Sequence, residues 1–296
     1  MFRGLATALI TPFNSTGVDY KSLEKLLEAQ IEGNVDALVI LGTTGEPATM
    51  TNDEKKAVID FVIKKVNKRV PVIVGAGSNC TATAVANSIS AEKQGADALL
   101  IVTPYYNKCT QEGLFRHYEA VAKAVHIPVF IYNVPGRTAV NILPQTARRI
   151  ASLPNICGIK EACGKMDQIK ETARVIASTK MRLFSGDDGL ATEIIKLGAD
   201  GLISVASNCI PKEMSQLVHL ALDKKFDEAN AMQAQLAPFI KALFSEVNPI
   251  PAKFACYKLG LCENVLRLPL TPMSKAKSND LLKCMESMHI GAVENN

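Results

Sequence analysis

The chain has 296 residues, of which 48% are hydrophobic and 21% charged, a composition typical of a globular protein that can bury a large core. Lys and Arg number 33 against 29 Asp and Glu, and the small excess is spread along the chain without basic runs. Aromatic residues make up only 5% and Trp is absent, which argues against a surface that stacks nucleic-acid bases. We therefore expect no nucleic-acid partner.

The N-terminus and the cysteines indicate a cytoplasmic protein. The apolar run near the start is broken by Thr11 and Pro12 and lacks a small-residue cleavage site, so it predicts a first strand rather than a signal peptide. No uncharged apolar stretch approaches the roughly 18 residues that span a bilayer, so we expect no membrane partner. The eight cysteines form no C-x-x-C pair, and several fall in apolar segments, which favours reduced thiols over disulfides or zinc sites.

Short apolar segments alternate with amphipathic ones along the chain. The segment after the first apolar run has a helical stripe that begins at Leu23, with Asp19 as its expected cap, and Thr51 to Glu54 has the spacing of a capping box. The apolar segments are rich in Val, Ile and Leu without strict alternation, as expected for strands buried on both faces. The predicted strands are Leu5–Ile10, Ala37–Leu41, Pro71–Gly75, Ala98–Val102, Pro128–Tyr132, Ile156–Lys160, Arg182–Ser185 and Gly201–Val205.

Eight strand–helix units in this length predict an α/β fold, a closed parallel (β/α)8 TIM barrel over residues 1–223. An open doubly wound sheet is the alternative, but Gly75 to Cys80 lacks the last glycine of a G-x-G-x-x-G loop and no Walker motif occurs. Three helical segments are expected in residues 224–296. We expect them to form a C-terminal helical extension on the barrel wall or at a subunit contact, because no Gly/Ser-rich linker separates them.

The active site of such a barrel lies at the carboxyl ends of its strands. None of the four His residues is expected there. Asp187 and Asp188 follow the seventh strand, but no His or third carboxylate converges on them, so we expect no metal-centred mechanism. The segments expected at the strand ends are 11–13, 42–46, 103–107, 132–137, 160–162, 185–188 and 204–207.

Lys160 is the most informative of these residues because it ends an apolar strand. Alternation places Ile156, Gly158, Lys160 and Ala162 on one face, so small neighbours leave room beside the amine. Burial of an ammonium lowers its pKa, and a neutral amine in a pocket can attack a ketone. The alternative is a strand-end Lys paired with a carboxylate such as Glu161.

Three further features could complete a site around this amine. Tyr132 ends the preceding strand, and its hydroxyl could carry protons. A Tyr is often simply a core residue whose ring packs inside and whose hydroxyl lies at the edge. The Gly42 to Glu46 loop offers hydroxyls and glycine-bracketed amides suited to a carboxylate, or it is a plain strand-to-helix turn. Arg137 could grip a second carboxylate, or be a solvated charge.

At these residues the chain resembles the dihydrodipicolinate synthase family of pyruvate-dependent aldolases, from Thr7 to roughly Pro272. The G-x-x-G-E loop, the Tyr and the Lys are shared across the superfamily. The Arg of NVPGRT is more particular to synthases and favours an aldehyde that bears a carboxylate. The matching motifs are GTTGE at 42–46, TPYYN at 103–107, YNVPGRT at 132–138, IKEACG at 159–164, SGDD at 185–188 and NPIPAK at 248–253.

The resemblance implies a function and a role for each matching residue. It implies condensation of pyruvate with aspartate semialdehyde in diaminopimelate and lysine biosynthesis, through a Schiff base on Lys160 and without a cofactor. It also implies a homotetramer, a dimer of dimers, in which a neighbouring subunit contributes Tyr106. The implied catalytic residues are Lys160, Tyr132, Thr43 and Tyr106, and the implied substrate-binding residues are Thr44 (with Thr43), Arg137, Gly186 and Ile203.

The chain departs from the pattern of lysine-inhibited family members at two positions. Asn79 and Tyr105 match that pattern, but Lys55 replaces a His and Thr83 replaces a Glu. Because a lost carboxylate and an added cation disfavour a cationic ligand, we expect weak or absent feedback by lysine. The rival functions are a sialic-acid or keto-deoxy-sugar-acid lyase, which would keep the Lys and Tyr, and a catalytically inactive barrel that acts as a sensor.

Overall fold

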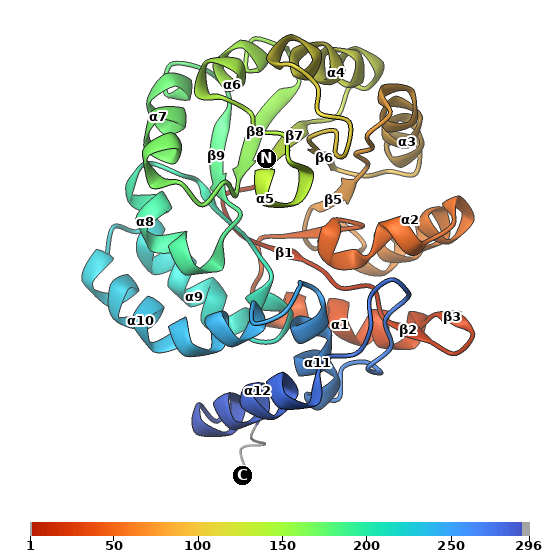
Figure 1. Cartoon of the computed structure of the whole chain (residues 1–296), viewed down its shortest axis with the longest axis vertical. Coiled ribbons are helices and arrows are strands. Elements are labelled where there is room, and N and C mark those ends of the chain that lie inside the picture. The colour runs from red at the N-terminus through yellow and green to blue at the C-terminus, as the bar shows by residue number, and fades with distance from the viewer. Residues whose placement is uncertain (1, 292–296) are drawn as a thin grey trace.

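The computed structural model describes residues 2–291 and contains a closed barrel of eight parallel strands (Figure 1). The strands neighbour one another in the order β1-β10-β9-β8-β7-β6-β5-β4, and β4 pairs with β1 to close the ring. This confirms the predicted TIM barrel and excludes the open doubly wound sheet. The strands are β1 Gly4–Ala8, β4 Ala37–Ile40, β5 Val72–Gly75, β6 Ala98–Val102, β7 Val129–Asn133, β8 Ile156–Glu161, β9 Arg182–Ser185 and β10 Gly201–Ser204.

Helices surround the barrel and follow its strands in sequence. The two predicted helix N-caps are confirmed: the Asp19 side chain accepts a hydrogen bond from the Ser22 amide, and Thr51 and Glu54 form a reciprocal capping box. The helices are α1 Tyr20–Glu32, α2 Asn52–Val66, α3 Thr81–Lys93, α4 Gln111–Ala124, α5 Pro135–Thr138, α6 Pro144–Ile150, α7 Met166–Ile176, α8 Ala191–Lys196, α9 Pro211–Leu222, α10 Phe226–Leu243, α11 Ile250–Lys258 and α12 Lys275–Ser287. Short 3-10 turns are η1 Thr43–Gly45, η2 Pro47–Thr49, η3 Asp188–Leu190 and η4 Ala206–Asn208.

The first predicted strand, Leu5–Ile10, begins one residue and ends two residues later than the observed strand, and the small hairpin after it was not predicted. The strand ends at Ala8, and the chain then forms β2 (Phe13–Asn14) and β3 (Gly17–Val18), an antiparallel pair outside the barrel. Two-residue strands are too short to show a periodicity, so the sequence pattern gave no signal for them.

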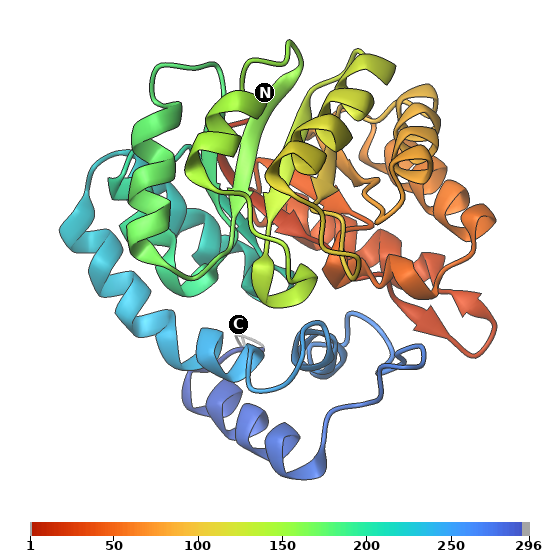
Figure 2. The ribbon, with the colours of Figure 1, turned by 45° about the horizontal axis from the view of Figure 1, so that its top comes forward.

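The C-terminal helices extend the barrel as predicted, but they do more than cover its wall. Figure 2 shows α10 to α12 across the end to which the strands point. Ala237, Ile240 and Phe244, from α10 and its end, line a cavity together with residues of the strand ends. The extension therefore forms one wall of the space where a barrel active site is expected.

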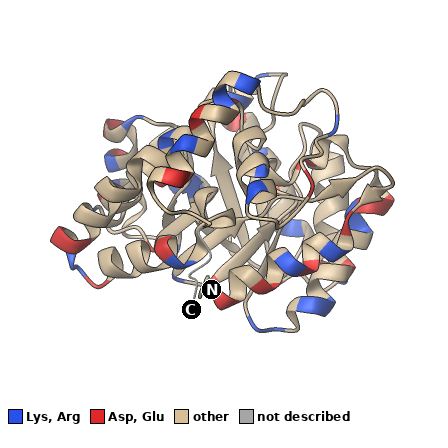
Figure 3. Ribbon diagram, turned by 90° about the horizontal axis from the view of Figure 1, so that it is seen from below, with Lys and Arg blue, Asp and Glu red and all other residues tan. Residues whose placement is uncertain are grey.

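Charge and hydropathy agree with the composition. Figure 3 shows Lys and Arg interspersed with Asp and Glu over the helices. No helix within residues 2–291 is long and apolar enough to cross a membrane.

Two apolar layers hold the barrel together, one inside it and one between strands and helices. The rings of Phe2, Phe130 and Phe184 pack inside, with centroids 4.7 Å apart for Phe2 and Phe184 and 5.5 Å apart for Phe130 and Phe184. These rings fill the interior, so the barrel is a packed core and its open space lies at the carboxyl ends.

Strand β8 departs from the alternation that the sequence predicts. The register slips between Val129 and Phe130, so that these neighbours pair with Ile156 and Gly158, respectively. As a result Ile156 packs in the outer layer, and its predicted position on the same face as Lys160 was wrong. Gly158 remains on the inner side, where a Cβ atom would lie 2.7 Å from the Phe130 ring.

We predict that Gly158→Ala destabilises the fold. Unfolding measurements alone test this, without a functional assay. The new methyl group would also lie 3.3 Å from the Arg182 carbonyl oxygen, so the Phe130 ring must move, at a cost of about 1–3 kcal/mol. Thermal and urea unfolding measure the loss. Gly136→Ala is the matched control, because nothing lies within 4 Å of its added Cβ. Equal stability of the two variants would contradict the packing described here.

Candidate active site

Lys160 lies at the carboxyl end of β8 and is 5% exposed. Its Cα pairs in register with that of Tyr132 on β7, and its Nζ lies 4.4 Å from the centroid of the Tyr132 ring. Within residues 2–291 Lys160 forms no ion pair. The alternative pairing with Glu161 is not observed, because Glu161 is buried and accepts from Asn133 Nδ2 at 3.0 Å instead.

Burial sets the protonation of both groups. It lowers the pKa of Lys160 to about 8, with Asp188 opposing the shift and Arg137 adding to it. It raises the pKa of Tyr132 to about 12, so the phenol keeps its proton at neutral pH. A partly neutral amine therefore lies against the ring of a phenol whose hydroxyl can both donate and accept a proton.

Space beside the Lys160 side chain depends on Gly186. A Cβ atom at this position would lie 2.9 Å from both the Ala162 Cβ and the Lys160 Cε. The Gly186 amide donates to the Glu161 carbonyl oxygen at 2.8 Å, which fixes the loop after β9 against β8. Any larger side chain would push the amine out of its position.

The loop after β4 forms a 3-10 turn that presents two hydroxyls. Thr43 is exposed and lines the cavity, whereas Thr44 is 3% exposed and its Oγ1 accepts from Asn248 Nδ2 at 2.9 Å. The Gly45 amide donates to the Gly42 carbonyl oxygen at 2.9 Å, which closes the turn. The predicted strand-to-helix turn and the predicted pair of hydroxyls are thus both present.

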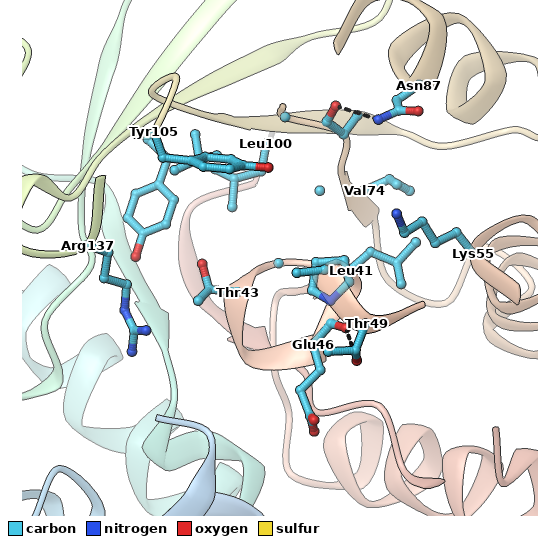
Figure 4. Close-up of a pocket in the computed structure, with 18 of the residues that line it drawn as sticks. Leu41, Thr43, Glu46, Thr49, Lys55, Val74, Asn87, Leu100, Tyr105 and Arg137 are labelled. Atoms are coloured by element: carbon cyan, nitrogen blue, oxygen red, sulfur yellow. Dashed lines mark hydrogen bonds between the residues drawn. The ribbon is translucent and has the colours of Figure 1, made fainter. Parts of the chain in front are cut away.

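Arg137 lies on α5, after β7, and its guanidinium is held from the C-terminal extension. Its Nη2 donates to the Asn248 carbonyl oxygen at 3.2 Å. Figure 4 shows Arg137 and Thr43 on the two sides of the same space. Sequence reasoning missed Asn248, although it opens the NPIPAK motif, because nothing in the sequence shows that this segment returns to the strand ends.

A cavity of about 510 Å³ brings most of the predicted residues together. This volume is in the range of small-molecule sites. A second cavity of about 710 Å³ adjoins it at Thr43, Tyr132 and Arg137 and extends toward Lys55 (Figure 4). The predicted residues that line the smaller cavity are Thr43, Thr44, Tyr132, Arg137, Lys160 and Gly186.

Two predicted site residues are not part of this cavity lining. Ile203 is fully buried inside the barrel, so only its backbone is a candidate for a role at the site. Tyr106 is 85% exposed, with a φ of 75°, in the connection between β6 and α4. Neither residue lines the two cavities described above.

The two carboxylates after β9 serve the backbone. Asp188 is buried and accepts from the Ser204 hydroxyl and, at 3.0 Å, from the Val205 amide, while Asp187 accepts from the Gly189 amide at 2.9 Å. Sequence reasoning considered Asp188 only as a possible cation ligand and missed its position near Lys160. Within residues 2–291 no group of three His, Cys, Asp or Glu side chains is arranged to hold a metal ion. The expected absence of a metal and a cofactor stays a prediction.

Comparison with known proteins places this geometry in a family. The model of the dihydrodipicolinate synthetase family matches residues 1–288. The chain belongs to this family. Membership confirms the resemblance seen in the motifs and makes the chain a lyase of this group.

Relatives match over nearly the whole length. A 4-hydroxy-tetrahydrodipicolinate synthase from Kosmotoga olearia is 47% identical over 288 residues, which are 97% of this chain and 98% of that protein. The structure of the chloride-inhibited dihydrodipicolinate synthase from Acinetobacter baumannii complexed with pyruvate has a TM-score of 0.96 and 44% identity, over 98% of this chain and all (100%) of the other. A monomeric dihydrodipicolinate synthase variant has a TM-score of 0.96 at 42% identity, over 98% of this chain and 97% of that one.

The pKa of Lys160 predicts how imine formation depends on pH. With a pKa near 8 about a tenth of the amine is neutral at pH 7, roughly 300-fold more than for an unshifted lysine. Since only the neutral amine attacks, we expect the rate of pyruvate trapping by borohydride to rise with pH and to level off above about pH 8. Trapping rates measured from pH 6 to 10 test this. A rate that still rises steeply between pH 9 and 10 would contradict the lowered pKa.

Proposed function

We propose that the protein is a 4-hydroxy-tetrahydrodipicolinate synthase, which condenses pyruvate with aspartate 4-semialdehyde in diaminopimelate and lysine biosynthesis. The observation that carries the proposal is the buried Lys160 amine, with its lowered pKa, against the Tyr132 ring in a cavity at the strand ends. The family and the named relatives support the same reaction.

In the proposed reaction the neutral Lys160 amine attacks C2 of pyruvate, and the carbinolamine loses water to give an imine. The Tyr132 hydroxyl passes the protons that these steps require, because no His lines the cavity. Loss of a C3 proton gives an enamine, whose C3 forms a bond to the aldehyde carbon. The amino group of the second substrate then attacks the imine carbon, which closes the ring and releases Lys160. The imine is the electron sink, so no cofactor is proposed.

Two carboxylates must be bound in this reaction, and the cavity has two suitable places. We assign the pyruvate carboxylate to Thr43 and Thr44, where hydroxyls and turn amides lie together. We assign the carboxylate of the semialdehyde to Arg137, whose planar guanidinium suits two parallel hydrogen bonds. Gly186 and the backbone of Ile203 are proposed to border the bound substrates.

Cleavage of a sialic acid or a keto-deoxy-sugar acid is the alternative that keeps Lys160 and Tyr132. It has less use for a cation at Arg137, because the second substrate there is an uncharged sugar aldehyde. An inactive sensor is disfavoured because the amine, the phenol and both carboxylate sites share one cavity.

We further propose a homotetramer, a dimer of dimers, in which Tyr106 enters the site of a neighbouring subunit. An aromatic ring that is 85% exposed, on a backbone held at positive φ, suits an interface better than solvent. Tyr132, Thr43 and that Tyr106 would then share the proton transfers. The monomeric relative shows that a family member can lack the assembly, so sedimentation is the direct test.

Localisation and domain organisation complete the proposal. All eight thiols are free within residues 2–291, which supports a reducing cytoplasm. We propose that the barrel of residues 1–223 and the helical region of residues 224–296 fold as one unit, because the extension supplies a wall of the cavity.

We predict that Arg137→Ala separates the two half-reactions. Loss of the guanidinium should lower kcat/KM for aspartate semialdehyde by roughly 10- to 150-fold, the value of about 1.5–3 kcal/mol of charged hydrogen bonding. Trapping of pyruvate should be nearly unchanged. A coupled assay that follows NADPH oxidation by the next reductase measures the first effect.

Arg148→Ala is the control, because this exposed residue of α6 lies outside both cavities. Absence of turnover in the native protein, with the coupling enzyme active, would remove the synthase proposal. Undiminished kcat/KM in Arg137→Ala would remove the carboxylate role.

We predict that lysine at physiological concentrations inhibits the protein weakly or not at all. Lys55 and Tyr105 both line the larger cavity, so a cationic ligand bound in it would meet a like charge. The double variant Lys55→His/Thr83→Glu should gain sensitivity, while Lys56→His should not. Dose–response curves of the coupled assay test this, and strong inhibition of the native protein would contradict it.

A further inference from the structure

A buried ion pair joins the Gly42–Glu46 loop to the start of α11. Lys253, in the first turn of α11, and Glu46, which ends the Gly42–Glu46 loop, form an ion pair whose side chains are 0% and 1% exposed. Figure 4 shows Glu46 projecting from the loop in a different direction from Thr43. Glu46 belongs to the lining of the larger cavity, but neither Glu46 nor Lys253 lines the smaller cavity beside Lys160. Neither residue has a role in the proposed reaction.

The pair belongs to a small network with balanced charge. Arg267 donates through its backbone amide to Glu46 Oε2 at 3.3 Å, and its Nη1 contacts Glu54 Oε2 at 2.8 Å. Both cations also lie against the Phe13 ring, with Lys253 Nζ 4.4 Å and Arg267 Cζ 4.2 Å from its centroid. Two cations and two carboxylates thus give the network no net charge.

Three separate contacts from the C-terminal extension reach the Gly42–Glu46 loop and the 3-10 turn that follows it. Asn248 donates to the Thr44 hydroxyl, Lys253 binds Glu46, and Arg267 Nη1 donates to the Thr49 carbonyl oxygen at 3.1 Å. Glu46 itself has left-handed backbone angles, φ 53° and ψ 40°, which a non-glycine residue adopts only when its surroundings hold it. Desolvating an ion pair is costly, so hydrophobic residues would satisfy stability alone at least as well.

We propose that Glu46 and Lys253 are positioning residues that hold the hydroxyls of Thr43 and Thr44 where they bind pyruvate. The inference rests on the proposed function for its substrate, but the placement of the loop is independent of it. The side chains touch no substrate and act through the loop, which they join to α11. The same helix start carries Asn248, so the pair also fixes the group that binds Arg137.

The test compares single variants with the double variant Glu46→Gln/Lys253→Met. Each single change leaves one buried charge unpaired and should lower Tm by roughly 5 °C or more. The double variant removes both charges and keeps an oxygen for the Arg267 amide, so its Tm should return toward that of the native protein. Its kcat/KM for pyruvate should nevertheless stay at least about tenfold down, because the loop is no longer tied.

Leu281→Ala, on α12 in the same extension, is the control for lost stability, since this fully buried residue lines neither cavity. Assayed below its Tm it should keep native kcat/KM. Native kcat/KM in the double variant, or a loss no larger than that of a Leu281→Ala protein of equal Tm, would overturn the positioning role.

Hydrogen exchange keeps this test separate from the proposed function. The Gly45 and Glu46 amides donate within the loop turn and should exchange faster in the double variant than in the native protein. If pyruvate can be trapped on the native protein by borohydride but is not condensed with the aldehyde, the synthase proposal fails. The trapping rates and the amide exchange rates of the variants would still test the positioning role. Unchanged exchange of both amides would overturn the positioning role whatever the activity.

Discussion

The burial of the Lys160 side chain is the constraint on which the site depends. In the closed parallel barrel β8 lies between β7 and β9, and the amine lies against the Tyr132 ring and forms no ion pair with the described residues, although Asp188 partly opposes the effect of burial. This environment disfavours the charged form and lowers the pKa to about 8. The shift corresponds to about 3 kcal/mol of destabilisation of the ammonium, which is present below pH 8 and vanishes as the pH rises toward 10.5. The same burial leaves part of the amine neutral, as the nucleophilic role proposed for Lys160 requires.

The C-terminal extension is needed to make the site complete. Strand ends supply Lys160 and Tyr132, but the orientation of Thr44 and Arg137 depends on Asn248, which lies just before α11. A barrel of residues 1–223 alone would leave these groups without their partner. The extension therefore supplies one wall of the smaller cavity and the hydrogen-bond partner of both Thr44 and Arg137.

The sequence predicted the parts of this protein that local chemistry determines. Buried parallel strands have apolar sequences, so all eight were predicted. A lysine at the end of such an apolar segment is unusual, which identified Lys160 as a candidate. Residues that the fold brings together from afar were missed. Asn248 is more than a hundred residues from Arg137. The register slip in β8, which moved Ile156 to the outer layer, arises from strand pairing and leaves no local pattern. Tyr106 is predicted to act in another subunit, and the roles of all site residues stay predictions until tested.

The most direct test of the account is the site of the covalent adduct. The native protein would be incubated with pyruvate, reduced with borohydride, digested, and its peptides sequenced by mass spectrometry. The account predicts one reduced pyruvate adduct, on Lys160, and none in a Lys160→Ala protein of native fold. An adduct on another lysine, or no adduct in an active preparation, would contradict the central claim.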